Sequence, residues 1–152
     1  MSDTITALRV APDGVRIAMI ARGSTGPGKV LLAAITPRGT TPSGVGPQAQ
    51  LNIGQNGLQA IGAGIADPTA LSWDDADHIL VLSGRRNGQL YSVPLDGGAA
   101  GQISTPAGAV SVATAGPGGQ VFVGTSAGKI MMSLSQGSWR QVAEGTVPVY
   151  PG

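Results

Sequence analysis

The stretch HILVLSGRRNGQLYSVPLDGG, residues 78–98, contains two short apolar runs, each followed by a turn that is rich in glycine. The first run, HILVLS, is almost continuously apolar, and the second, QLYSVPL, alternates between apolar and polar residues. Runs of this length, bounded by Gly, Asn and Asp, are typical of β-strands joined by tight turns. The stretch therefore predicts two antiparallel strands, the first of them covered on both faces.

The same pattern occurs three times along the chain. Its glycine-bounded turns are GSTGPGKV at 23–30, GRRNGQL at 84–90 and GTSAGKI at 124–130. A further apolar run precedes each unit: ITALRV at 5–10, PTALSW at 68–73 and AVSVAT at 109–114. Weaker fourth strands are predicted at about 51–62, 102–105 and 139–143. Units of four strands that repeat about every 40 residues are typical of β-propellers, in which each unit forms one blade.

We therefore predict an all-β fold: a partial β-propeller of about three four-stranded antiparallel blades, half of a six-bladed ring. A single fragment would span residues 1–152, with blades at about 4–62, 68–105 and 109–143. The longer first unit contains TPRGTTPSGVGPQAQ at 36–50. Its content of Gly, Pro and Thr predicts a surface loop.

The turn GSTGPGKV is one residue away from a nucleotide-binding P-loop, G-x-x-x-x-G-K-[ST]. Val30 stands where the motif needs a hydroxyl to bind Mg²⁺. The motif also needs a helix after the loop, whereas KVLLAAIT at 29–36 has the composition of a strand. The two equivalent turns bear no resemblance to a P-loop, so 23–30 is predicted to be a hairpin turn within the first blade.

Composition excludes several classes of function. The chain has 152 residues, no cysteine and a formal net charge of +1. Nothing in this charge balance points to nucleic acid, and without cysteine there are no disulfides or thiolate zinc sites. No apolar run approaches the roughly 20 residues that span a bilayer, and the first residues do not have the pattern of a signal peptide.

The residues with catalytic potential do not form a recognisable set. His78 is the single histidine, and the aspartates beside it in WDDADHI (73–79) lack the spacing of a calcium loop. Ser126 lies in GTSAG, a near miss to a nucleophile elbow placed in a predicted hairpin turn, and Glu144 is the single glutamate. We therefore predict no catalytic, cofactor-binding or metal-binding residues, and no enzyme.

Five residues are candidates for binding a partner. Trp73 ends a first strand, the innermost of its blade, so it is expected either near the central channel or between blades. Trp139 opens an outer strand and could be partly exposed, as a sugar-stacking platform. Arg85 and Arg86, at a loop tip, could contact an acidic partner or remain solvated. Asp75 belongs to a turn that is expected to be solvated.

The order and the amino-acid sequence of the repeats resemble the C-terminal β-propeller of LpqB-type actinobacterial cell-envelope lipoproteins. The most specific matching pieces are TALRVAPDG at 6–14, WDDAD at 73–77 and YPG at 150–152. The resemblance covers the chain from Ile5 to Gly152. It implies a protein on the extracytoplasmic face of the membrane, held by an N-terminal lipid, with a GerMN-type domain before the propeller. It also implies an accessory role beside a two-component sensor kinase.

The expected lipid-bearing cysteine, the GerMN-type domain and half of the propeller are not in this sequence. Rings of four to eight blades are the norm, so three blades should leave an apolar face at each end. We expect two copies to pair around a two-fold axis and rebuild a six-bladed ring. Alternatively, the other half has been removed by proteolysis or left out by design.

The function expected from these observations is that of a non-catalytic protein-interaction module, with the extracytoplasmic part of a sensor kinase as its partner. The alternative is a propeller that binds cell-wall glycans through Trp73 or Trp139. The sequence leaves the binding face open between two sets of turns. One set is 11–14, 74–77 and 116–119, and the other is 23–28, 84–88 and 124–128.

Overall fold

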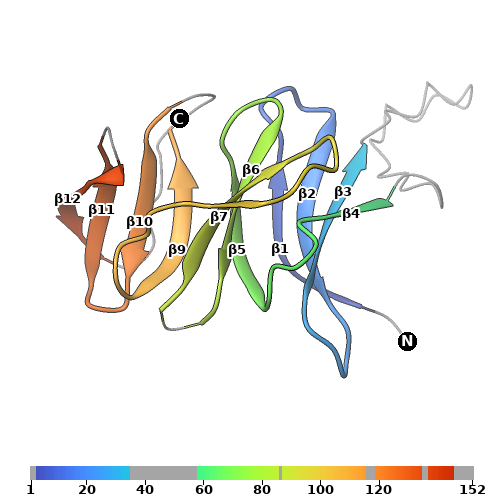
Figure 1. Ribbon diagram of the computed structural model, residues 1–152, viewed down its shortest axis with the longest axis horizontal. Coiled ribbons are helices and arrows are strands. Elements are labelled where there is room, and N and C mark those ends of the chain that lie inside the picture. Colours follow the sequence, from blue (N-terminus) through green and yellow to red (C-terminus); the bar gives the residue numbers. More distant parts are fainter. Residues whose placement is uncertain (1–2, 35–57, 86, 116–118, 135–136, 146–152) are drawn as a thin grey trace, which may run out of the picture.

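The computed structural model describes residues 3–34, 58–85, 87–115, 119–134 and 137–145, and these residues form three four-stranded antiparallel sheets with no α-helix (Figure 1). The first sheet contains β1 (Thr4–Val10), β2 (Arg16–Arg22), β3 (Lys29–Ala34) and β4 (Leu58–Ile61). The second contains β5 (Pro68–Trp73), β6 (His78–Ser83), β7 (Gln89–Pro94) and β8 (Gly101–Gln102). The third contains β9 (Ala109–Thr114), β10 (Val121–Thr125), β11 (Lys129–Ser133) and β12 (Trp139–Glu144). The all-β prediction of three four-stranded blades is confirmed, and the sheets are called blades 1, 2 and 3 below.

Each blade is built from consecutive strands, paired in the order in which they occur along the chain. The turn 23–28 connects β2 to β3, so the stretch that resembles a P-loop is a hairpin turn, as predicted. The predicted insert at 36–50, its turn at 37–39 and the ending at 150–152 lie outside the described residues.

The fourth strand of blade 2 differs from the prediction. A strand was expected at 102–105, but β8 is limited to Gly101–Gln102. Beyond it, Thr105 Oγ1 accepts the backbone N–H of Leu90 at 2.9 Å, and Gln89 Nε2 donates to that same hydroxyl at 2.9 Å. The N–H of Ile103 still donates to the carbonyl of Leu90 at 3.0 Å. The N–H of Leu90, however, bonds to the Thr105 hydroxyl instead of a backbone carbonyl, so regular strand pairing ends early.

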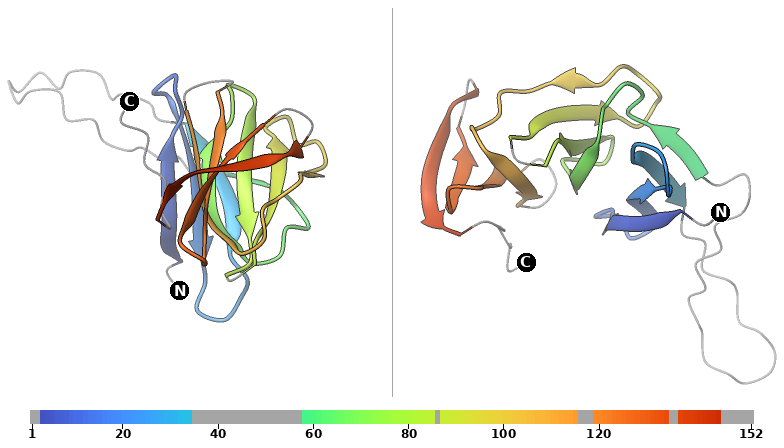
Figure 2. Two further views of the ribbon diagram at one scale, coloured as in Figure 1. Left: turned by 90° about the vertical axis from the view of Figure 1, so that its left-hand side faces the viewer. Right: turned by 90° about the horizontal axis from the view of Figure 1, so that it is seen from below.

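The three blades stand side by side along an arc (Figure 2). The first strands, β1, β5 and β9, lie on the concave side, and the last strands, β4, β8 and β12, lie on the convex side. Two hydrophobic clusters fill the spaces between neighbouring blades. Strand β6 contributes to both, because Ile79 and Val81 pack toward blade 1 while Leu80 and Leu82 pack toward blade 3. This two-sided burial explains why HILVL is continuously apolar.

The two connectors between blades end in a similar way. Residues 62–67 join blade 1 to blade 2, and residues 103–108 join blade 2 to blade 3. The last residue of each has a positive φ, 45° at Asp67 and 75° at Gly108. The carbonyl of Asp67 accepts the N–H of Gly84 at 3.0 Å, and that of Gly108 accepts the N–H of Ser126 at 2.8 Å. Among the described residues, Asp67 is the single non-glycine residue with a positive φ.

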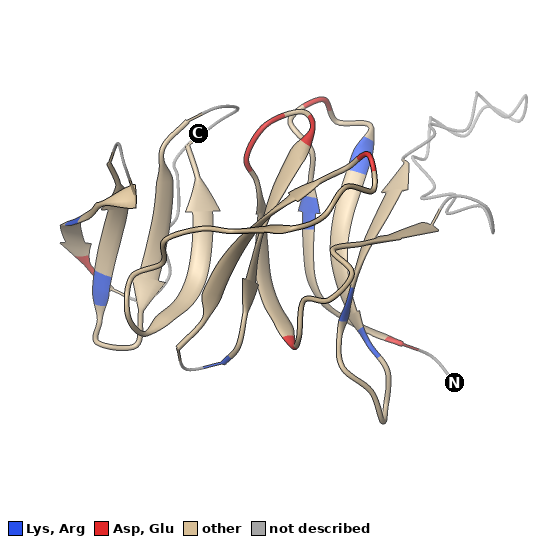
Figure 3. Ribbon diagram, viewed as in Figure 1, with Lys and Arg blue, Asp and Glu red and all other residues tan. Residues whose placement is uncertain are grey.

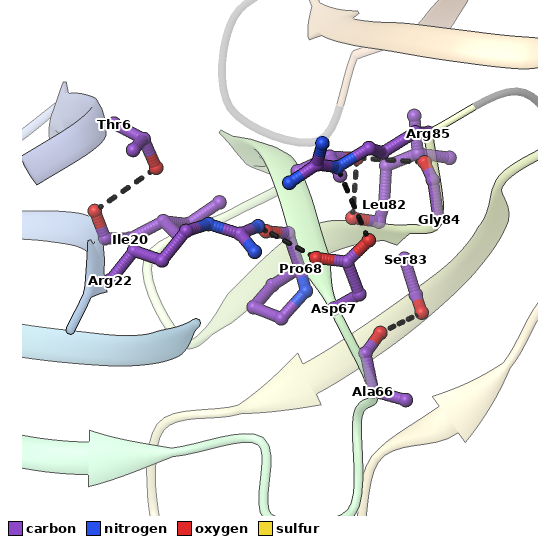
Figure 4. A network of polar contacts seen from close by, with 11 residues as sticks. Thr6, Ile20, Arg22, Ala66, Asp67, Pro68, Leu82, Ser83, Gly84 and Arg85 are labelled. Atoms are coloured by element: carbon purple, nitrogen blue, oxygen red, sulfur yellow. Dashed lines mark hydrogen bonds and ion pairs between the residues drawn. The ribbon is translucent and has the colours of Figure 1, made fainter. Parts of the chain in front are cut away.

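Asp67 is also the centre of an ion-pair network between blades 1 and 2 (Figure 4). Its Oδ1 lies 2.7 Å from Nη2 of Arg22, which comes from blade 1, and its Oδ2 lies 3.7 Å from Nε of Arg85. Nη2 of Arg22 also donates to the carbonyl of Pro68 at 3.2 Å. A short polar side chain is tolerated in the left-handed region better than most others, which fits aspartate at this position.

Candidate protein-interaction site

The charged side chains of the described residues are sorted between the two ends of the arc (Figure 3). At one end, the turns after β1, β5 and β7 carry most of the described aspartates: Asp13, Asp74, Asp75, Asp77 and Asp96. We call this the acidic end. The opposite end carries most of the basic side chains: Arg22, Lys29, Arg85 and Lys129. The sequence left the binding face open between two sets of turns. The acidic end contains turns 11–14 and 74–77 of the first set.

The turn between β5 and β6 is held together by its own aspartates. Asp75 Oδ1 accepts the backbone N–H of Asp77 at 2.7 Å and lies 3.0 Å from Nδ1 of His78. The backbone N–H of Asp74 donates to the carbonyl of His78 at 3.1 Å. The predicted start of a strand at His78 is therefore confirmed.

Two carboxyl groups of this turn have opposite shifts of their pKa. The hydrogen bond from the N–H of Asp77, followed by the contact with His78, lowers the pKa of Asp75. Burial, followed by the negative charge of Asp75, raises the pKa of Asp74. The surroundings of the turn therefore favour the charged form of Asp75 and disfavour the charged form of the partly buried Asp74.

Trp73 is buried between blades 1 and 2, with 5% of its surface exposed. Its indole Nε1 donates to the carbonyl of Arg9 at 3.1 Å, and the guanidinium carbon of Arg16 lies 5.2 Å from the ring centroid. Arg16 in turn pairs with Asp13 at 2.7 Å. Of the two positions expected from the sequence, the structure shows the one between blades, where the ring offers little free face to a sugar.

Asp13 and Arg16 were not singled out by sequence reasoning, although they complete the acidic end. Asp13 accepts the N–H of Val15 at 2.9 Å and the Nε–H of Arg16 at 2.8 Å. The bond from Val15, followed by those from Arg16, lowers the pKa of Asp13. The one available sequence signal was APDG (11–14). An aspartate in such a turn is expected to accept a hydrogen bond from the backbone N–H two residues further on.

The remaining candidate residues do not join this site. Arg85 lies at the opposite end with 72% of its side chain exposed, and Arg86 lies outside the described residues. Trp139 lies on the convex side, where its Nε1 donates to the carbonyl of Ser104 at 3.2 Å. It borders an apolar cavity of about 180 Å³ between blades 2 and 3, which Leu90, Ile103 and Leu134 also line.

The described residues contain no group of three or more His, Asp or Glu side chains that could hold a metal ion. His78 begins β6 at the acidic end, whereas Ser126 follows β10 at the opposite end. The structure therefore does not bring this serine and the histidine together. In the part of the chain that the structure covers, no helix is long and apolar enough to cross a membrane.

Comparison with known proteins gives consistent matches over almost the whole chain. A family model described as the "Lipoprotein LpqB beta-propeller domain" matches residues 1–151. A curated "Lipoprotein LpqB" of Thermobifida fusca is 37% identical over 155 residues, which is 97% of this chain and 22% of that protein. A "Lipoprotein LpqB" of Streptomyces coelicolor is 30% identical over 153 residues, which is 97% of this chain and 24% of that protein. The chain thus spans less than a quarter of the length of these relatives.

Proposed function

The chain belongs to the LpqB β-propeller family, and on that premise we propose that it is a non-catalytic protein-interaction module of a cell-envelope lipoprotein. Its curated relatives are named as lipoproteins. The proposed location is the extracytoplasmic face of the membrane, and the proposed partner is the extracytoplasmic part of a two-component sensor kinase. The observation that carries this proposal is the acidic end, where the exposed aspartates of two neighbouring blades outnumber the one arginine beside them, Arg16.

The turn geometry favours binding over catalysis. The polar contacts of Asp13 and Asp75 shape their own turns, and among the described residues no buried side-chain nitrogen or oxygen lacks a hydrogen-bond partner. A catalytic site commonly keeps a polar group poised for substrate, whereas a docking surface needs only a fixed shape and charge. Asp77 and Asp96 are exposed and are therefore the side chains most available to a basic segment of a partner.

The test is the affinity of the chain for the isolated extracytoplasmic domain of the sensor kinase, measured by calorimetry at two salt concentrations. A variant with Asp77→Asn and Asp96→Asn should bind at least tenfold more weakly at low salt, and the difference should shrink at high salt. The matched control, Lys29→Gln with Lys129→Gln, changes two exposed charges at the opposite end and should leave the affinity unchanged. Equal binding by both variants would exclude the acidic end, and no binding by the wild-type chain would exclude the kinase.

A second candidate function is glycan binding, and the partly exposed Trp139 beside its apolar cavity is the observation that favours it. Cell-wall fragments that stack on this ring should change the tryptophan fluorescence of the wild-type chain but not that of Trp139→Phe. The fluorescence of the buried Trp73 remains in that variant as an internal reference. A titration without any change in the wild-type chain would exclude this candidate.

A further inference from the structure

Four residues of the chain are followed directly by glycine, in pairs that are prone to a spontaneous backbone reaction: Asp13, Asn56, Asn87 and Asp96. In such a pair the backbone nitrogen of the glycine attacks the side-chain carbonyl carbon of the aspartate or asparagine and closes a five-membered succinimide ring. Glycine favours this attack because it has no β-carbon to obstruct it. Asn56 lies outside the described residues, and the surroundings of the other three pairs decide which of them can react in the folded chain.

The pair Asn87–Gly88 is held at both of its reacting groups. The N–H of Gly88 donates to the carbonyl of Ala109 at 2.9 Å. The side-chain Oδ1 of Asn87 accepts the N–H of Gly108 at 2.8 Å, and Gly88 is also buried. Because the nitrogen and the amide must both leave these partners before a ring can close, the folded state protects this pair.

The pair Asp13–Gly14 is protected in a similar way. The N–H of Gly14 donates to the carbonyl of Ala11 at 2.9 Å. The carboxylate of Asp13 accepts the N–H of Val15 at 2.9 Å and lies 2.7 Å from the guanidinium of Arg16. This ion pair favours the charged form of the carboxyl group, and a carboxylate is attacked less readily than the neutral acid. Both the nucleophile and the electrophile of this pair are therefore restrained.

The pair Asp96–Gly97 lies in the turn after β7 and lacks both restraints. Asp96 Oδ1 accepts the N–H of Gly98 at 2.8 Å, but none of the hydrogen bonds between described residues uses the N–H of Gly97. None of the ion pairs between described residues involves Asp96. Both residues are exposed, and a β-carbon on Gly97 would have no neighbour within 4 Å. The nitrogen is therefore free to attack, and the turn has room for the ring.

We propose that Asp96–Gly97 is a modification site, at which the folded chain isomerises spontaneously to isoaspartate. The nitrogen of Gly97 forms a bond to Cγ of Asp96, the proton of that nitrogen passes to solvent, and one carboxyl oxygen leaves as water. A water molecule then opens the succinimide at either carbonyl group. When it cleaves the bond between the original backbone carbonyl carbon and the nitrogen, the bond from Cγ to nitrogen remains and the product is isoaspartate. One water is lost and one is gained, so no other reactant is needed and the mass is unchanged.

Isomerisation alters the acidic end, because it adds one carbon atom to the backbone of the turn and moves the charged carboxylate onto the α-carbon. The turn is joined to its neighbour, since the N–H of Leu95 donates to the carbonyl of Asp77 at 2.9 Å. Asp77 and Asp96 are the exposed carboxylates on which the proposed docking depends. The reaction therefore modifies the proposed docking surface, but it follows from the chemistry of the turn and does not depend on that function.

The first test is peptide mapping of the chain after incubation at neutral pH and physiological temperature, with electron-transfer fragmentation to distinguish isoaspartate from aspartate. In the folded chain, isoaspartate should form at least about fivefold faster at Asp96 than at Asp13, because breaking even one hydrogen bond lowers the reactive population by about that factor. In guanidinium chloride the two positions should react at similar rates. No isoaspartate at Asp96 in the folded chain, or equal rates at the two positions, would overturn the proposal. A rate at Asp13 that stays low after unfolding would also overturn it, since the contacts of the fold would not be the cause.

The second test compares two chemically identical pairs in one folded chain. Asp96→Asn places an asparagine before Gly97, as Asn87 stands before Gly88. Deamidation replaces the amide by a carboxyl group and is detected as a change in peptide mass. The amide at position 96 should be lost at least about tenfold faster than that of Asn87, whose pair is held by two hydrogen bonds. Equal rates of deamidation at the two positions would show that the fold does not select the site and would overturn the proposal.

Discussion

The indole Nε1 of Trp73 donates a 3.1 Å hydrogen bond to the backbone carbonyl of Arg9, and this bond joins the ends of the first strands of two blades. The next blade continues the connection through Thr114, whose hydroxyl donates to the carbonyl of Trp73. The three first strands are therefore linked in series on the concave side of the arc. Apolar packing supplies most of the stability between blades, and these bonds fix how the blades are aligned.

Trp73→Phe should lower the free energy of unfolding by about 1–3 kcal/mol, because the carbonyl of Arg9 loses its donor in a partly buried position. Trp73→Ala should cost about 3–5 kcal/mol through the cavity that it leaves. Denaturant unfolding followed by circular dichroism measures both. Trp139→Phe is the control, since its bond to Ser104 is solvent-exposed, and its loss should be smaller than that of Trp73→Phe. Equal losses at the two tryptophans would contradict the role of Trp73 between blades.

Substitutions at Asp67 should separate backbone strain from the ion pairs. Asp67→Asn keeps a side chain that tolerates a positive φ and loses only the charge that faces Arg22 and Arg85. Asp67→Ala loses the same charge and also places an ordinary side chain in the left-handed region, at a further cost of about 1 kcal/mol. Asp67→Ala should therefore unfold at a lower temperature than Asp67→Asn in a thermal unfolding experiment. If they unfold at the same temperature, the positive φ is not a constraint at this position.

Gly88→Ala should destabilise the contact between blades 2 and 3. A β-carbon on Gly88 would lie 2.8 Å from the carbonyl oxygen of Ala109 and 2.8 Å from the side chain of Leu82. The N–H of Gly88 also donates to that carbonyl at 2.9 Å, so the backbones cannot separate without losing a bond. Overpacking of this kind costs about 1–3 kcal/mol.

Gly26→Ala is the matched control for this substitution, because a β-carbon at Gly26 has no neighbour within 4 Å. It should change the unfolding midpoint by less than a third of the change caused by Gly88→Ala. A comparable shift for both variants would show that general turn flexibility, rather than close approach between blades, decides the effect.

Asp74→Asn should stabilise the fold at neutral pH by a few tenths of a kcal/mol, the usual size of a surface effect. Burial and the charge of Asp75 raise the pKa of Asp74, so its ionised form disfavours the folded state above the pKa of the unfolded chain. As the pH falls through the raised pKa of the folded state, the wild-type carboxyl becomes neutral and the advantage of asparagine disappears. Unfolding midpoints of both proteins between pH 7 and pH 3 (roughly the range in which aspartates titrate) measure this. If Asp74→Asn remained more stable than the wild-type chain at low pH, the raised pKa of Asp74 would not be the cause of the difference.

Strand and turn positions were predictable because their signals are local. Apolar runs bounded by glycine mark β2, β6 and β10, and each of these strands lies where its run predicts. The short β8 was not predictable in the same way, since its early end depends on the hydroxyl of Thr105 accepting the backbone N–H of Leu90, with Gln89 donating to the same hydroxyl. A sequence window around 102–105 contains no sign of that competition.

The site was predictable only in part, because its main relationships cross between blades. Asp75 was singled out for its turn, and the turn is present as expected. The location of Trp73 depended on which neighbour its strand faces, and that is decided by the packing of β5 against blade 1. Asp67 was missed altogether, since its role depends on a positive φ and on Arg22, which is distant in sequence.

Each blade consists of consecutive strands, and the connectors 62–67 and 103–108 have equal length and the same final backbone geometry. A blade is therefore a self-contained structural unit. Recombination between two connectors would insert or delete a complete blade while every strand keeps its partners. Related proteins can in this way acquire rings of different size from one ancestral repeat, without passing through a form in which a strand is unpaired.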